Sequence, residues 1–259
     1  MTDPLGGPAV TTFTKRREAA EPGSIPDVLQ MFPREVRFYR ELAPYVGVRT
    51  PACYVAEEHD GATHLELEDL SSWQPGADPE VAARLLGDLH RRFEGTAVDR
   101  WPWLPRPDVA HLVGPMYDDA WATARERPEL TDPVRHLGDS LVGRVAEVEQ
   151  RAGASGPVTF THGDASALNM RTSPDGEVAL LDWEDYGAGP GIVDLAWHLV
   201  SSVAPDDWDL ALAAYGDTSG FFDALPSVAV QGLLSFAFEE GRDDAREWVE
   251  ALEEAASRM

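Results

Sequence analysis

Two short apolar segments, and the polar stretch that follows the first of them, constrain most strongly what this chain can fold into. Residues 157–160 (PVTF) and 177–183 (EVALLDW) have the β-branched and apolar content of strands, with a Pro-Asp-Gly turn signal between them. The polar residues 162–169 (HGDASALN) follow the first segment, and Asp182 lies at the end of the second. A hairpin-like arrangement would bring both sets of polar side chains to one edge.

Three of these residues, Asp164, Asn169 and Asp182, are of the types that phosphoryl transfer needs. One carboxylate must orient an attacking hydroxyl group and accept its proton, and further oxygen ligands must hold Mg²⁺ against the nucleotide phosphates. The sequence therefore predicts a phosphoryl-transfer site. The alternatives are that Asp164 only bonds its own loop backbone and that Asp182 only caps a strand. A hydrolytic metal site with His162 and Asp164 is disfavoured, because no second His-containing cluster accompanies them.

The N-terminal part of the chain has the pattern of a strand, a helix and a hairpin. Residues 9–16 (AVTTFTKR) have the composition of a strand and end in a basic pair. Residues 32–43 (FPREVRFYRELA) have a proline suited to a first helical turn and apolar residues at helical spacing. Two alternating segments, 52–58 and 63–68, flank an Asp-Gly pair that signals a tight hairpin turn.

Glu35 is unusual because helical spacing places it on the apolar face, together with Phe38, Tyr39 and Leu42. Its neighbours three and four residues away include no basic side chain, so a partner must come from elsewhere in the chain. Lys15, on the preceding strand, is a candidate. The alternative is that Glu35 stays in solvent and complements the dipole of the first helical turn.

The rest of the chain is mainly helical. A helix starts at Asp78, residues 131–153 predict one long helix, and the uncharged run 224–238 predicts a core helix. We therefore predict an α+β fold, with a small N-terminal lobe over residues 1–70 and a larger, mainly helical lobe over residues 71–259.

Composition excludes several classes of function. The chain has 46 acidic against 21 basic residues, a formal charge of −25, which disfavours nucleic acid and anionic membrane surfaces as partners. The same charge would attract a cationic small molecule, although an acidic surface is also common without one. Cys53 is the single cysteine, so no intrachain disulfide can form. We find no signal-peptide pattern at the N-terminus and expect a cytoplasmic protein.

The order of the motifs resembles a known family. His-Gly-Asp, four intervening residues, Asn, and then Leu-Asp-Trp-Glu look like the catalytic motifs of the aminoglycoside phosphotransferase/choline kinase family, which are relatives of the protein kinases. Residues 189–199 (GPGIVDLAWHL) resemble the continuation of that motif, and residues 33–42 and 65–70 resemble the family's small-lobe helix and hinge. The resemblance covers residues 9–200 and implies a protein-kinase-like two-lobed fold.

The resemblance also implies roles around the reacting groups. Asp164 would be the catalytic base, and Asn169 and Asp182 would be ligands of Mg²⁺. His162 and Asp194 would be structural and would brace the catalytic loop through hydrogen bonds.

For the nucleotide, the resemblance implies a second set of residues. Lys15 would contact the α- and β-phosphates of ATP and would pair with Glu35. The backbone around Glu68, Asp69 and Leu70 would hold the adenine.

One departure concerns the N-terminus. The family places a hairpin with a glycine-containing phosphate loop before the lysine strand, whereas fourteen residues precede Lys15 here; Gly6 and Gly7 are a candidate remnant. We therefore expect either an abbreviated N-terminal lobe or a chain that starts late relative to its relatives, and both would weaken nucleotide binding. The predicted function is ATP- and Mg²⁺-dependent phosphorylation of a hydroxyl group on a small polar molecule, with an aminoglycoside-type acceptor first. An amino alcohol, sugar or other metabolite is the nearest alternative, and a weakly active or inactive nucleotide-binding module is an alternative of another class.

Overall fold

The structure is a computed structural model that describes residues 11–106, 110–239 and 242–259, except for the side chains of residues 242–244. Gly6 and Gly7, the candidate remnant of a phosphate loop, lie outside the described residues.

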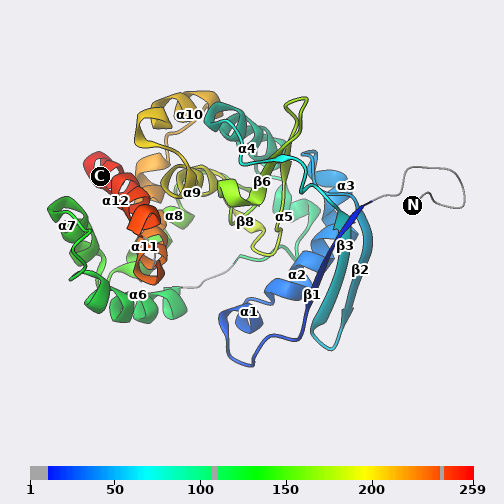
Figure 1. Cartoon of the computed structure of the whole chain (residues 1–259), viewed down its shortest axis with the longest axis horizontal. Helices are drawn as coiled ribbons and strands as arrows, with labels where there is room; N and C mark the ends of the chain where they lie inside the picture. The colour runs from blue at the N-terminus through cyan, green and yellow to red at the C-terminus, as the bar shows by residue number, and fades with distance from the viewer. Residues whose placement is uncertain (1–10, 107–109, 240–241) are drawn as a thin grey trace, which may run out of the picture. The chain divides into compact units, whose positions relative to one another are not determined.

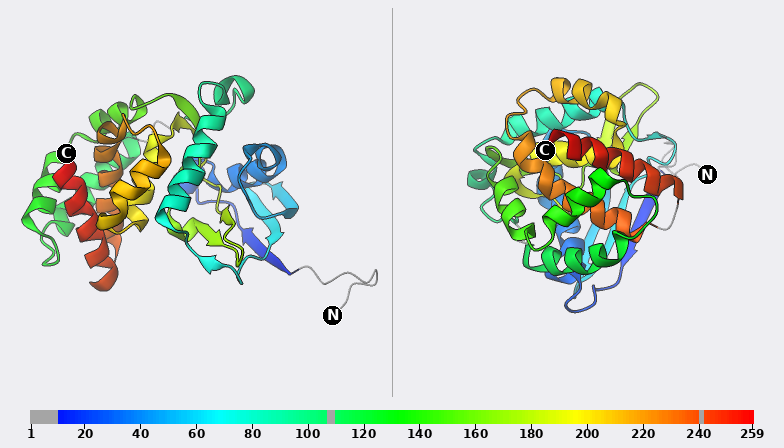
Figure 2. Two further views of the ribbon diagram at one scale, coloured as in Figure 1. Left: turned by 90° about the horizontal axis from the view of Figure 1, so that it is seen from above. Right: turned by 90° about the vertical axis from the view of Figure 1, so that its left-hand side faces the viewer.

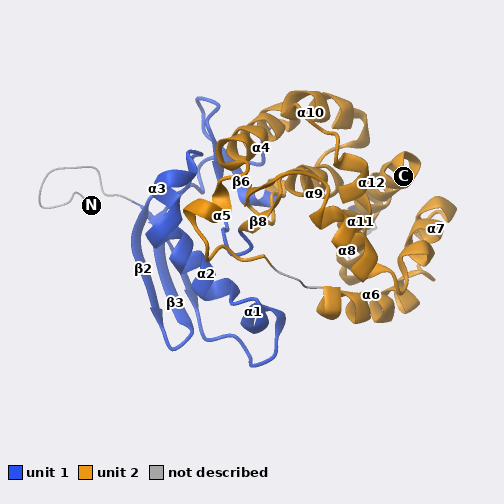
Figure 3. Cartoon of the chain, turned by 180° about the vertical axis from the view of Figure 1, so that it is seen from behind, with its two compact units in different colours: residues 1–77, 168–186 blue, residues 78–167, 187–259 orange. Residues whose placement is uncertain are grey.

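The chain divides into two compact units, which Figure 3 shows in different colours. The first unit comprises residues 1–77 and 168–186, and the second comprises residues 78–167 and 187–259. These units differ from the predicted lobes, 1–70 and 71–259, chiefly because residues 168–186 pack with the N-terminal part of the chain.

The first unit contains a three-stranded antiparallel sheet (Figures 1 and 2). Its order is β1-β3-β2, with β1 at Thr12–Arg17, β2 at Cys53–His59 and β3 at Ala62–Glu68. Asp60 and Gly61 join β2 to β3 with φ values of 49° and 82°. Two consecutive positive φ angles are typical of a tight hairpin turn, so the predicted hairpin is confirmed.

A helical run covers one face of this sheet. After α1 (Ile25–Val28) it comprises α2 (Met31–Arg37), a π-helical segment (Phe38–Leu42) and α3 (Ala43–Val46), which includes the predicted helix over residues 32–43. The side chains of Val36, Phe38 and Leu42 are at most 1% exposed. The apolar stripe read from the sequence is therefore the face that packs on β2 and β3.

A second small sheet completes the first unit. It has the order β4-β6-β7, with β4 at Gln74–Pro75, β6 at Met170–Thr172 and β7 at Val178–Leu180. The strand before Asp182 therefore pairs with β6, and not with residues 157–160 as we expected. The Pro-Asp-Gly turn joins β6 to β7, and a strand of three residues is too short to leave a periodic signal in the sequence.

The second unit is mainly helical and carries one two-stranded sheet, β5 (Val158–Thr161) with β8 (Gly187–Pro190). Its helices, labelled in Figure 1, are α4 (Pro79–Phe93), α5 (Ala97–Arg100), α6 (Ala110–Ala124), α7 (Asp132–Leu141), α8 (Val145–Gly153), α9 (Ile192–Ser202), α10 (Trp208–Tyr215), α11 (Phe221–Phe238) and α12 (Arg242–Arg258). Short 3₁₀ turns occupy Ala167–Asn169 and Pro205–Asp207. The α+β fold class is confirmed.

Two helix predictions in this unit have different outcomes. Asp78 caps α4, because its Oδ1 accepts hydrogen bonds from the backbone N–H groups of Glu80 (3.0 Å) and Val81 (3.2 Å). The single long helix predicted over residues 131–153 is wrong. Gly143, with a φ of 69°, separates α7 from α8, since a left-handed residue ends the helical hydrogen-bond pattern.

Helix α11 contains the uncharged run that predicted a core helix. It is long and apolar enough to cross a membrane by length and composition alone, but 67% of that window is buried inside the protein. This burial is typical of a core helix, and Leu225, Val228 and Val230 of α11 are fully buried.

Candidate active site

A cavity of about 330 Å³ lies in the first unit. Its walls come from β1, α2, the segment after β3 and the two ends of the β6–β7 hairpin. The lining includes seven of the eight predicted site residues: Lys15, Glu35, Glu68, Asp69, Leu70, Asn169 and Asp182. The eighth, Asp164, belongs to the second unit and is described with it below.

The ammonium group of Lys15 lies between two of the predicted carboxylates. Its Nζ is 2.7 Å from Glu35 Oε2 and 2.7 Å from Asp182 Oδ1. The Glu35 side chain is 3% exposed, so the alternative of a solvent-exposed glutamate at the helix N-terminus is wrong. A buried carboxylate needs a charged or hydrogen-bonding partner, and Lys15 supplies it from the neighbouring strand.

Glu184 and Arg17 complete this cluster, and neither had a predicted role. Glu184 Oε2 lies 2.6 Å from Arg17 Nη1 and 3.6 Å from Lys15 Nζ. Carboxylate oxygens of Glu35, Asp182 and Glu184 all lie within 4.8 Å of one another. The signal that could have found Arg17 is its spacing, because residues two apart on a strand share a face.

The pKa of Glu35 is raised from 4.5 to about 7, and burial of the carboxylate is the largest cause. The attraction of Lys15 lowers this pKa, whereas repulsion by Asp182 and Glu184 contributes to raising it. The cluster has three carboxylates but two cationic groups, so the repulsion is only partly offset. The pKa of Lys15 is also raised: burial lowers it, but Glu35 and Asp182 together raise it more.

This pKa predicts how the stability of the nucleotide-free protein changes with pH. Between about 4.5 and about 7 the folded state binds more protons at Glu35 than the unfolded state does, so the free energy of unfolding falls as the pH rises through this window. The fall is at most about 3 kcal/mol. We expect Glu35→Gln to remove this slope in chemical denaturation, whereas Glu57→Gln, at an exposed position of β2, retains it. Equal slopes for wild type and Glu35→Gln would contradict the assignment.

The segment that carries Asp182 has an uncommon backbone conformation. Asp182 has a φ of 55°, in the left-handed region that few residues other than glycine adopt. Before it, the N–H of Leu181 donates to the carbonyl oxygen of Asn169 (2.8 Å). After it, the buried ring of Trp183 stacks on Phe38 with centroids 4.2 Å apart. The hairpin thus brings Asn169 and Asp182 to one end. An uncommon backbone angle such as that of Asp182 is often found at functional sites.

The end of β3 and the residues that follow it line the cavity. The carboxylate of Glu68 accepts hydrogen bonds from Arg49 Nη2 (2.6 Å) and from the N–H of Ala52 (3.0 Å). Burial raises the pKa of Glu68, but these hydrogen bonds lower it more. The ionised carboxylate forms an ion pair with Arg49. The N–H groups of Glu68 and Asp69 donate to the carbonyl oxygens of Ala52 (2.7 Å) and Thr11 (3.2 Å), so the predicted contact of this backbone with adenine stays a prediction.

Exposed apolar side chains also line the cavity. Phe13 is 54% exposed and Leu168 is 83% exposed, although both are large and apolar. Together with the buried Leu67 they give the cavity an apolar wall. An apolar wall beside a few fixed polar groups is typical of a small-molecule site.

Asp164 lies in the second unit, on the loop that follows β5. Its Oδ1 accepts a hydrogen bond from the indole Nε1 of Trp197 (2.7 Å). The N–H groups of His162 (2.6 Å) and Gly163 (3.0 Å) both donate to the carboxylate of Asp194, which is 3% exposed. Asp194 therefore fixes the backbone just before Asp164.

The carboxylate of Asp194 is itself held from another helix. His90 Nε2, on α4, is 3.1 Å from Asp194 Oδ2, and His90 Nδ1 is 2.9 Å from the hydroxyl of Tyr215. Burial raises the pKa of Asp194, but the hydrogen bond and charge of His90 lower it more, so the net shift is downward. A buried, ionised carboxylate that accepts several hydrogen bonds is a rigid anchor for a loop. Neither His90 nor Tyr215 was predicted as part of this network.

A family model matches most of this chain. The model of a phosphotransferase enzyme family matches residues 20–230. No match was found among curated proteins.

Solved structures with the same fold include three small-molecule kinases. A microcompartment-associated aminopropanol kinase has a TM-score of 0.57 at 15% identity, over 96% of this chain and 84% of that one. The aminoglycoside phosphotransferase of Streptomyces rimosus, in complex with ADP and streptomycin, has a TM-score of 0.53 at 18% identity, over 95% and 86% of the two chains. The choline kinase of Streptococcus pneumoniae has a TM-score of 0.55 at 16% identity, over 86% and 81%.

These structures confirm the protein-kinase-like fold, since their identities are too low to show more than the fold. The family model covers most of the chain, including β2, β3, the loop with Asp164 and the β6–β7 hairpin. The chain therefore belongs to the phosphotransferase enzyme family.

Proposed function

We propose that the protein is a kinase that transfers the γ-phosphate of ATP to a hydroxyl group of a small polar molecule, in the cytoplasm and with Mg²⁺. One observation carries this proposal: a lysine, an asparagine and an aspartate line one cavity together with apolar side chains. These are the parts that hold a nucleotide and its metal ion in phosphoryl transfer.

For the nucleotide, the cavity supplies an apolar end and a charged end. Phe13 and Leu168 would cover the faces of the adenine, while the backbone of residues 68–70 would hydrogen-bond its edge. Lys15 would hold the α- and β-phosphates, and Glu35 would keep the ammonium group in place through its 2.7 Å contact. A volume of about 330 Å³ is at the lower end of the range for small-molecule sites.

The donor set at the charged end fits a hard divalent cation. Asp182 offers a carboxylate and Asn169 a carboxamide at the same end of the β6–β7 hairpin, and the surrounding carboxylates exceed the cations. When bound there, Mg²⁺ would neutralise phosphate charge. Lys15, whose Nζ lies 2.7 Å from Asp182 Oδ1, would contact the phosphates beside this site.

Asp164 is proposed as the catalytic base. Its carboxylate would orient the acceptor hydroxyl and accept its proton, a role that contributes about 10²- to 10⁴-fold to a rate. The hydrogen bonds that the N–H groups of His162 and Gly163 donate to Asp194 would keep the Asp164 carboxylate in position.

We propose an aminoglycoside-type acceptor first, on the family resemblance and because a formal charge of −25 attracts polycationic molecules. An amino alcohol is the second candidate, because it is also cationic and because solved kinases of aminopropanol and choline have this fold.

A panel of acceptors tests the proposal. We expect the full chain, with Mg²⁺ and ATP, to form ADP and a phosphorylated product with at least one aminoglycoside, and to show a thermal shift with Mg·ATP. Turnover with amino alcohols or neutral sugars alone would keep the chemistry and change the acceptor. No turnover with any acceptor would contradict the kinase, and a thermal shift without turnover would favour an inactive nucleotide-binding module.

A further inference from the structure

One face of helix α9 holds almost every residue of the loop that carries Asp164. Side chains three or four residues apart on a helix share a face, and α9 places four such side chains against the loop. The contacts are Asp194 to the N–H groups of His162 and Gly163, Trp197 to the carboxylate of Asp164, His198 to the carbonyl of Ala165, and Ser202 to the N–H of Ala167.

Three of these four side chains fix backbone atoms. His198 Nδ1 lies 2.9 Å from the carbonyl oxygen of Ala165, and burial lowers the pKa of His198 to about 4, so the imidazole is neutral and Nδ1 donates. The hydroxyl of Ser202 accepts from the N–H of Ala167 at 2.7 Å. These contacts set the path of the loop through its backbone.

Trp197 is the side chain of α9 that contacts the Asp164 carboxylate itself. Its indole Nε1 can only donate, and it lies 2.7 Å from Asp164 Oδ1. This is a short, charge-assisted hydrogen bond, which fixes the rotation of the carboxylate. The indole is half-buried, so the contact is partly shielded from competing water.

The ring of Trp197 is in turn held by a second helix. Its centroid lies 6.0 Å from that of Trp248 on α12, with 32° between the planes. Trp248 packs over Gly232 of α11, where a Cβ atom would lie 3.4 Å from its ring. The indole donor therefore sits on a packed set of helices rather than on a loop.

We propose that Trp197 is a positioning residue for phosphoryl transfer: it orients the Asp164 carboxylate toward the acceptor hydroxyl by holding Oδ1. This inference rests on the proposed role of Asp164 as the base. Because Trp197 belongs to the second unit, and the residues proposed to bind nucleotide line a cavity of the first, its loss affects the chemical step rather than nucleotide affinity.

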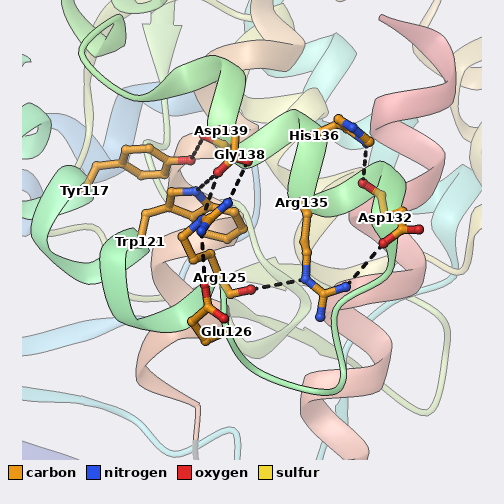
Figure 4. Close-up of polar contacts among 9 residues, drawn as sticks. All are labelled: Tyr117, Trp121, Arg125, Glu126, Asp132, Arg135, His136, Gly138 and Asp139. Atoms are coloured by element: carbon orange, nitrogen blue, oxygen red, sulfur yellow. Dashed lines mark hydrogen bonds and ion pairs between the residues drawn. The ribbon is translucent and has the colours of Figure 1, made fainter.

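Trp197→Phe keeps an aromatic ring and removes the donor. We expect kcat to fall by about 10-fold while the KM for ATP stays within about 2-fold of wild type, since a charge-assisted hydrogen bond in the transition state is lost and ground-state nucleotide binding is not. The matched control is Trp121→Phe. Trp121 Nε1 donates to Asp139 Oδ1 at 2.9 Å (Figure 4), which is the same chemistry in the same unit, and we expect an unchanged kcat.

A double-mutant cycle separates positioning from a general loss of structure. In an Asp164→Asn background the base is already absent, so we expect Trp197→Phe to change the residual rate by less than about 2-fold. An unchanged kcat in Trp197→Phe, an equal fall in Trp121→Phe, or a full 10-fold fall in the Asp164→Asn background would each overturn the inference. Wild-type protein without any acceptor phosphorylation would instead overturn the proposed function, so the two failures are distinguishable.

Discussion

We expect an Asp164→Asn variant to transfer phosphate about 10²- to 10⁴-fold more slowly than the wild type and to bind Mg·ATP with unchanged affinity. Asparagine has the shape of aspartate, and its carbonyl oxygen can still accept the hydrogen bond from Trp197, but it cannot accept the proton of a hydroxyl group. Steady-state kinetics with the best acceptor of the panel measures the rate, and calorimetry measures nucleotide binding.

The control for this variant is Asp139→Asn. Asp139 also accepts an indole N–H, from Trp121, and lies in the same unit, so it reports the cost of removing a comparable charge away from the loop (Figure 4). We expect its turnover to equal that of the wild type. Wild-type turnover in Asp164→Asn would show that the base is another residue.

We expect an Asp182→Asn variant to bind Mg·ATP about 100-fold more weakly than the wild type. This corresponds to a loss of about 2.7 kcal/mol of binding free energy. Asparagine is preferred to alanine here because Asp182 has a φ of 55°, and asparagine tolerates the left-handed region. The loss arises because a neutral amide replaces the carboxylate that we propose as a metal ligand.

We expect the same substitution not to destabilise the nucleotide-free protein at neutral pH. Asp182 raises the pKa of Glu35 by repulsion, so its removal lowers that pKa and leaves Lys15 to pair with Glu35. We expect Asp182→Asn to unfold at a temperature no lower than the wild type without nucleotide. Asp175→Asn, at an exposed position of the same hairpin, is the control and should bind Mg·ATP normally. Equal affinity of Asp182→Asn and wild type for Mg·ATP would remove Asp182 from the metal site.

Local patterns predicted the fold where they were long or chemically distinctive. The alternation in residues 63–68 and the Asp-Gly turn predicted the β2–β3 hairpin, and the stripe of residues 32–43 predicted the face that α2 packs on the sheet. The pairing of β7 with β6 was missed because β6 has three residues. The break between α7 and α8 was missed because a single glycine inside an apolar pattern does not by itself show that it adopts a positive φ.

The site was predicted unevenly for a related reason. The buried, partnerless position of Glu35 could be read from helical spacing, and Lys15 is the partner that the structure shows. Seven predicted residues line one cavity, while their roles stay predictions. Arg17 was missed because it belongs to no motif, and Glu184 was missed because the motif that contains it implied no role for it. His90, Tyr215 and Trp197 were missed because their contacts join residues far apart in the chain.

The transfer of a labelled γ-phosphate from ATP tests the central claim most directly. Wild-type protein and Asp164→Asn are incubated side by side with Mg²⁺, γ-labelled ATP and the acceptor panel, and the label is followed into organic product. We predict labelled phosphomonoester of an acceptor with the wild type and almost none with Asp164→Asn. Label that stays in ATP, or that appears only as inorganic phosphate, would contradict the account.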